Sequence, residues 1–147
     1  MKRFFIMGLV SLFAITAAVR DARTHHPEKG EKMQIIVRAD GSMILFTLND
    51  SLAAEALYDQ LPLSIEVEDY GRNEKIFYPP KQLPTADTPP ADARAGTLAY
   101  YAPWGNVVMF YADFGTARGL YALGHAVSGA ERIKELSGIV TIERVPR

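Results

Sequence analysis

The chain has 147 residues, a formal net charge of −1 at neutral pH and no cysteine. The lack of cysteine excludes a disulfide framework, a thiolate metal site and thiol catalysis. The near-neutral charge lacks the basic excess of nucleic-acid-binding proteins, so we expect no nucleic-acid partner.

Residues 1–18 have the pattern of a secretory signal peptide. The basic pair Lys2 and Arg3 precedes an apolar run over residues 4–15, and small residues follow up to Ala18. The alternative is an uncleaved anchor, but the run is shorter than the roughly 20 apolar residues that span a bilayer. We therefore predict an exported protein, periplasmic or secreted. Once the signal is cleaved, no basic amphipathic segment suggests membrane binding.

Residues 19–32 are polar and charged and contain a proline and a glycine, which is typical of a flexible linker. His25 and His26 lie in this segment, and imidazole is a common metal ligand. Adjacent histidines in a flexible linker lack the fixed geometry of a metal site, so we interpret them as solvated. We expect no metal site and no cofactor, and a folded domain over residues 33–147.

The predicted domain begins with a hairpin and a helix. Residues 33–39 and 43–48 are strand-like, and the Asp-Gly pair at residues 40–41 is a strong turn signal between them. Residues 49–51 supply helix-capping side chains, and residues 52–57 have helical composition.

A second pair of strands and a long loop follow. Residues 63–68 alternate between apolar and polar side chains, which predicts a half-buried strand, and residues 74–78 return as its partner. Residues 79–95 contain five prolines and no periodic pattern. They predict a surface loop of a length that is uncommon in compact domains and often functional or mobile.

The next hairpin is rich in aromatic residues. Residues 96–102 and 106–112 are strand-like, and Trp104, the only tryptophan, lies in the turn between them. Because successive side chains of a strand face opposite sides, one of Tyr100 and Tyr101 must face inward and the other outward. These aromatics therefore either complete the core or line a groove.

The C-terminal part predicts a short strand over residues 120–123, a second helix, and a closing strand over residues 139–145. Ser128 and Glu131 have the spacing of a capping box at the start of that helix. The whole pattern of short strands with two short helices is mainly β. It favours an antiparallel barrel or sandwich over a parallel sheet.

The order of these elements resembles a bacterial family of cyclophilin-like domains in which no prolyl isomerase is established. Three segments carry the resemblance: NDSLAAEALYDQL with LSIEVEDYGRNEKIFY after it, YYAPWGN with MFYADFG after it, and GLYALGHAVSGAERIKEL. Together they span nearly all of residues 33–142. The resemblance implies a closed antiparallel eight-stranded β-barrel with two short helices.

The resemblance also allows the residues of cyclophilin catalysis to be placed. By motif order, the cyclophilin arginine falls near Lys75, the pocket phenylalanine near Phe110, and the pocket histidine or tryptophan near Leu120. Lysine lacks the planar donor fork of arginine. His125 lies after the glycine of its motif, and we interpret it as structural. We therefore expect no catalytic residue.

The charged residues Asp69, Arg72, Glu74 and Lys75 surround the turn between the second pair of strands. The simpler interpretation is a solvated hairpin end with weak ion pairs. The alternative is a cluster that anchors a substrate.

The predicted binding site has an apolar wall of Tyr78, Tyr101, Trp104 and Phe110, with Lys75 as a cationic donor to a carbonyl or carboxylate. The predicted function is binding of a small molecule or proline-containing peptide without catalysis. The alternatives are a periplasmic peptidyl-prolyl cis-trans isomerase and a protein-interaction module that docks through its Trp104 tip and the proline-rich loop.

Overall fold

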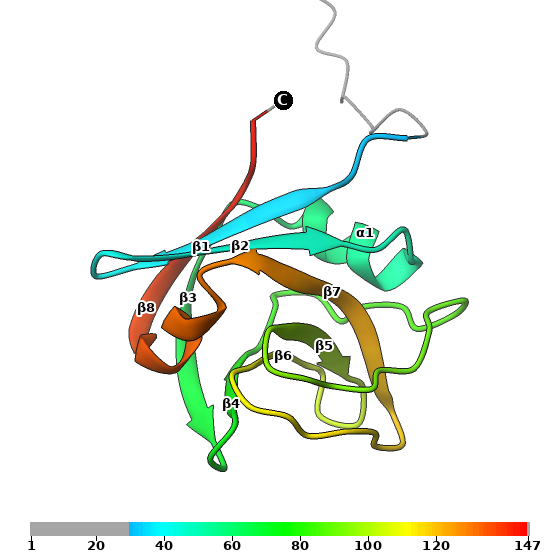
Figure 1. Ribbon diagram of the computed structural model, residues 1–147. Coiled ribbons are helices and arrows are strands. Elements are labelled where there is room, and N and C mark those ends of the chain that lie inside the picture. Colours follow the sequence, from blue (N-terminus) through cyan, green and yellow to red (C-terminus); the bar gives the residue numbers. More distant parts are fainter. Residues whose placement is uncertain (1–29, 147) are drawn as a thin grey trace, which may run out of the picture.

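Eight antiparallel strands close into a barrel in the computed structural model, which describes residues 30–146 (Figure 1). The predicted signal peptide, residues 1–18, and residues 19–29 of the predicted linker lie outside the described residues. The strands are β1 (Gln34–Ala39), β2 (Ser42–Leu48), β3 (Leu63–Tyr70), β4 (Glu74–Phe77), β5 (Thr97–Tyr101), β6 (Asn106–Phe110), β7 (Leu120–Ser128) and β8 (Gly138–Arg144). The predicted fold class, a mainly β closed eight-stranded barrel, is confirmed.

The order of strands around the barrel is β1-β2-β7-β5-β6-β4-β3-β8, and β8 pairs with β1 to complete the ring. Alternate side chains point inward, as the period of a strand requires. On β1, Ile35 and Val37 are buried while Arg38 is exposed, and on β8 the buried residues are Val140 and Ile142. The barrel interior is therefore filled by an aliphatic and aromatic core.

The helix α1 (Leu52–Asp59) begins at the predicted cap, because the Ser51 side chain accepts a hydrogen bond from the amide of Ala54. Its buried residues Ala53 and Leu57 pack against the barrel core. In the part of the chain that the structure describes, no helix is long and apolar enough to cross a membrane.

The predicted start of the second helix is wrong. The helix is a 3-10 helix, η1 (Ala130–Glu135), and its N-cap is Gly129 in the left-handed conformation, with no side-chain cap. Ser128 cannot cap it, because β7 continues to this residue and pairs it with Leu45 of β2. The strand is longer than the four residues predicted because it pairs with both β5 and β2, which lie far away in sequence.

The proline-rich loop over residues 79–95 packs closely against the barrel. The hydroxyl of Tyr100 accepts a hydrogen bond from the amide of Leu83 at 3.2 Å. The amide of Ala91 donates to the carbonyl of Leu120 at 3.0 Å, and Leu83 and Ala91 are both buried. Leu83 and Tyr100 belong to the main barrel core, whereas Ala91 and Leu120 belong to a second apolar cluster, so the loop is anchored at two separate places.

Tyr100→Phe is expected to lower the free energy of unfolding by about 1–2 kcal/mol, because it leaves the buried amide of Leu83 without an acceptor and keeps the ring. Urea unfolding of both proteins measures this difference. The control is Tyr121→Phe, since the Tyr121 hydroxyl makes no hydrogen bond to any described residue. Equal losses in the two variants would contradict the anchoring role of Tyr100.

Candidate functional site

Strand β6 is buried on both of its faces. One face packs in the barrel core, and the other face packs in a second apolar cluster outside the barrel. Val107 and Met109 point into the barrel core, whereas Val108 and Phe110 point outward. The outward residues belong to a second, smaller apolar cluster, composed of Ile76, Ala91, Ala93, Ala99, Val108, Phe110 and Leu120. The outer face of β6 is thus covered by other parts of the chain.

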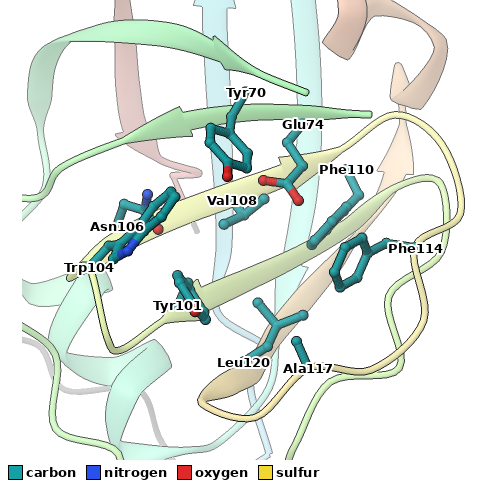
Figure 2. Close-up of a pocket in the computed structure, with 10 residues that line it drawn as sticks. All are labelled: Tyr70, Glu74, Tyr101, Trp104, Asn106, Val108, Phe110, Phe114, Ala117 and Leu120. Carbon is teal, nitrogen blue, oxygen red and sulfur yellow. The ribbon is translucent and has the colours of Figure 1, made fainter. Parts of the chain in front are cut away.

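A cavity of about 220 Å³ opens beside this second cluster (Figure 2). Its lining combines aromatic and aliphatic side chains with two polar ones: Tyr70, Tyr101, Trp104, Phe110, Phe114, Val108, Ala117, Leu120, Glu74 and Asn106. The lining comes from β3, β4, β5, β6, the turn between β5 and β6, the connection between β6 and β7, and the first residue of β7. We refer to it as the Trp104 cavity.

The indole of Trp104 is held between two tyrosines. Its ring centroid lies 5.0 Å from that of Tyr70 at an interplanar angle of 86°, and 5.4 Å from that of Tyr101 at 77°. Both are edge-to-face arrangements, which aromatic pairs favour. The turn that carries Trp104 is fixed by the amide of Gly105, which donates to the carbonyl of Tyr101 at 2.9 Å.

The opposite wall is formed by Phe110 and Phe114, whose ring centroids lie 5.4 Å apart. Phe114 belongs to the connection between β6 and β7, and its amide donates to the carbonyl of Ala93 at 3.0 Å. In the same connection, a carboxylate oxygen of Asp113 accepts from the amide of Ala95 at 3.0 Å. These hydrogen bonds fix Phe114 in place over the cavity.

Two polar side chains of largely buried residues in the cavity lack partners. Glu74 is 9% exposed, and among residues 30–146 its carboxylate has neither a hydrogen bond nor an ion pair. Burial raises the pKa of Glu74 above its ordinary value of 4.5. The side-chain oxygen of Asn106, a residue only 1% exposed, also has no hydrogen-bond partner in the described structure. Since buried polar groups are normally paired, both are available to a ligand.

The structure brings three of the predicted site residues together, because Tyr101, Trp104 and Phe110 all line the Trp104 cavity. Lys75 and Tyr78 are not among the residues that line it. Lys75 pairs in register with Met109 of the barrel core, and its buried ammonium group forms an ion pair with Asp69. The cavity therefore holds a carboxyl group where the sequence predicted a cation.

A sequence model described as the Cyclophilin-like family matches residues 37–143. This chain belongs to the cyclophilin-like family. Among solved structures, a hypothetical protein of Archaeoglobus fulgidus, determined in solution, covers 82% of this chain and 100% of its own, with a TM-score of 0.62 and 18% identity. At that identity the likeness shows a shared fold alone. No curated protein matches the chain.

Seven of the ten lining residues of this cyclophilin-like barrel were not among the predicted site residues: Tyr70, Glu74, Asn106, Val108, Phe114, Ala117 and Leu120. Glu74 was interpreted as part of a charged turn that is either solvated or anchors a substrate. The alternation of β4 holds a signal that could have found it, because Glu74 must share a face with Ile76, which is buried in the outer cluster. The residues that cover that face come from β6 and the connection after it.

Glu74→Gln is expected to raise the melting temperature at pH 7 and to leave it unchanged at pH 4. A carboxyl group whose pKa is raised in the folded state destabilises the fold only when it is ionised. This cost is absent below the unfolded pKa of about 4.5 and grows as the pH rises through the folded pKa. Thermal unfolding at the two pH values measures it.

The control for this prediction is Glu68→Gln on β3, where the side chain is exposed. It should leave the melting temperature unchanged at both pH values. A wild type that melts at the same temperature as Glu74→Gln at pH 7 would show that the ionised carboxylate carries no cost in the folded protein.

Proposed function

We propose that this cyclophilin-like barrel binds a small organic ligand, or one side chain of a peptide, in the Trp104 cavity without catalysing a reaction on it. The observation that supports this proposal is the pairing of aromatic walls with two unpartnered polar groups. Ligand pockets typically combine apolar walls with a few polar groups that orient the ligand. At about 220 Å³, the cavity is smaller than the roughly 300–1,000 Å³ of drug-sized sites and suits a head group or side chain.

Prolyl isomerisation is less well supported by the geometry. Phe110 lines the cavity and could contact a proline ring, but the described lining includes no lysine or arginine. Lys75, the residue placed nearest the cyclophilin arginine, is engaged by Asp69. The polar groups that the cavity offers are a carboxyl and an amide, which favours binding over polarisation of a prolyl bond.

A partner-docking role is also less favoured. Trp104 is 48% exposed, but it lies at the rim of a concave cavity and contacts two tyrosines there. A docking surface would instead be expected to present a broad exposed apolar patch.

Fluorescence of Trp104 tests the proposed function directly, because it is the only tryptophan in the chain. Saturable changes with small aromatic probes or X–Pro peptides are expected. In a protease-free assay, the same X–Pro peptides should isomerise at the spontaneous rate, which takes about tens to hundreds of seconds. A faster rate in the wild type that is lost in Lys75→Ala would overturn the non-catalytic proposal.

We also propose that the barrel acts outside the cytoplasm, on the strength of the signal-like pattern in residues 1–18. Mass spectrometry of the protein recovered from the periplasm or medium is expected to show a chain that starts at Val19. Recovery of only the full-length chain from the cytoplasm would contradict the proposal.

A further inference from the structure

We propose that the ligand of the Trp104 cavity is an organic cation, in which an ammonium or alkylammonium group contacts Tyr70, Tyr101 and Trp104 and pairs with the carboxylate of Glu74. This inference rests on the proposed function and names the ligand class for the same site. Three observations support it: an unpaired buried carboxylate, the arrangement of the rings, and the absence of any cation among the described lining residues.

The first observation is the lone carboxyl group. Glu74 is the one residue of the described lining with a carboxyl, ammonium, guanidinium or imidazole group, it is 9% exposed, and its carboxyl group has no partner among the described residues. A buried charge is costly unless an opposite charge or hydrogen bonds compensate it. Figure 2 shows the Glu74 carboxylate and the Tyr70 hydroxyl pointing towards the space above Val108. A cation in that space would supply the missing partner.

The second observation is the geometry of the aromatic rings. The interplanar angles between Trp104 and the rings of Tyr70 and Tyr101 are 86° and 77°. The indole is therefore nearly perpendicular to both tyrosine rings, and the three rings form an aromatic corner without stacking. In an edge-to-face pair, the faces of the ring that contributes its edge are not covered by the other ring of the pair. The face of an aromatic ring is negative and attracts cations, and tryptophan is the strongest of the three aromatic types. Aromatic cages of this composition recognise alkylated ammonium groups.

The charged groups around Glu74 do not replace such a ligand. Lys75, next to it on β4, is held by Asp69 on the other face of the strand. On the facing elements, Tyr70 of β3 and Tyr101 of β5 are the titratable residues in the described lining, while β6 and the β6–β7 connection contribute only uncharged side chains: Asn106, Val108, Phe110, Phe114 and Ala117. The nearby charged residues outside the lining are exposed: Glu68, Arg72, Asp113 and Arg118.

Asn106 adds a second acceptor to the cavity. Its side-chain oxygen is buried and has no donor among the described residues. A primary ammonium group carries N–H donors that could satisfy it, whereas a quaternary ammonium group has none. Both kinds of cation fit the aromatic corner, and the two can be compared directly.

The test uses four probes of similar size that share a phenyl ring: benzylammonium, benzyltrimethylammonium, benzyl alcohol and benzoate. Titration followed by Trp104 fluorescence at pH 7.5 is expected to show the two cations binding at least tenfold more tightly than the alcohol, and benzoate most weakly. Glu74→Gln should remove this preference by weakening the cations at least tenfold. Glu68→Gln should leave all four dissociation constants unchanged.

A second readout separates the charge of Glu74 from a general structural effect. Benzyltrimethylammonium cannot titrate, so any pH dependence of its binding belongs to the protein. Its affinity for the wild type is expected to fall as the pH is lowered from 7.5 to 4, because Glu74 becomes protonated. In Glu74→Gln the affinity should be low and independent of pH over this range.

The outcomes distinguish this inference from the proposed function. Equal or tighter binding of benzyl alcohol or benzoate would overturn the cation inference while the cavity remained a binding site. Unchanged cation binding in Glu74→Gln would also overturn it. If none of the probes or X–Pro peptides altered the fluorescence, both the inference and the proposed function would fail.

Discussion

Replacing Trp104 with alanine is expected to weaken the binding of benzylammonium roughly 30-fold while the barrel stays folded. Trp104 is half exposed, so its removal sacrifices little buried area. It is also the ring that contacts both Tyr70 and Tyr101, so without it the aromatic corner is lost. Tryptophan is enriched among the residues whose truncation costs a binding site about 2 kcal/mol or more, which corresponds to this change in affinity.

Isothermal titration calorimetry is the suitable measurement, because Trp104→Ala removes the fluorescent reporter. The matched control is Tyr78→Ala. Tyr78 is an aromatic residue with the same 48% exposure, but it does not line the cavity. Its replacement should leave the dissociation constant unchanged. An equal loss in both variants would favour the wall predicted from the sequence, which included Tyr78, over the cavity described in the structure.

Replacing Gly124 with alanine is expected to lower the free energy of unfolding by about 3 kcal/mol or more, at the upper end of the usual cost of overpacking. Gly124 lies on β7 and pairs in register with Leu48 of β2. A Cβ atom at this position would lie 2.2 Å from the carbonyl oxygen of Thr47 and 2.9 Å from the Cα of Leu48. Both are backbone atoms, so a rotamer change cannot relieve the clash, and the two strands must separate.

Gly41→Ala provides the comparison, because it makes the same chemical change without a steric clash. Gly41 has a φ of +82° and no atom within 4 Å of an added Cβ. Its substitution should cost only the roughly 1–2 kcal/mol of the left-handed conformation. Urea unfolding of the two variants at one temperature measures both values. If Gly124→Ala cost no more than Gly41→Ala, the close approach of β2 and β7 would be contradicted.

The features of the fold that the sequence predicted well are local ones. The hairpin around Asp40 and Gly41 and the cap at Ser51 depend on residues next to one another, and both were placed correctly. The capping box at Ser128 and Glu131 looked equally local. It was overridden because β7 continues through Ser128 to pair with β2, a constraint that comes from more than 80 residues earlier in the chain.

In the candidate site, too, the locally determined residues were predicted and the residue whose position depends on distant parts of the chain was not. The aromatic hairpin identified Tyr101, Trp104 and Phe110; alternation along the paired strands sets the sides of Tyr101 and Phe110, and Trp104 lies in the turn between these strands. Motif order pointed to Lys75, one position from Glu74, and neighbouring residues of a strand face opposite sides. Alternation within β4 puts Glu74 on the same face as Ile76, but that this face lines a cavity depends on β6 and Phe114, which lie more than 30 residues later in the chain.

The closed ring has a consequence for the folding of the chain. Pairing β1 with β8 joins residues 35–38 to residues 141–144, so the contact order is high and closure must wait for the last strand. Until β8 is in place, β1 and β3 each present an unpaired edge, and such edges recruit strands from other chains. The same topology that leaves the finished barrel without an edge therefore makes the incomplete chain the species most prone to aggregate.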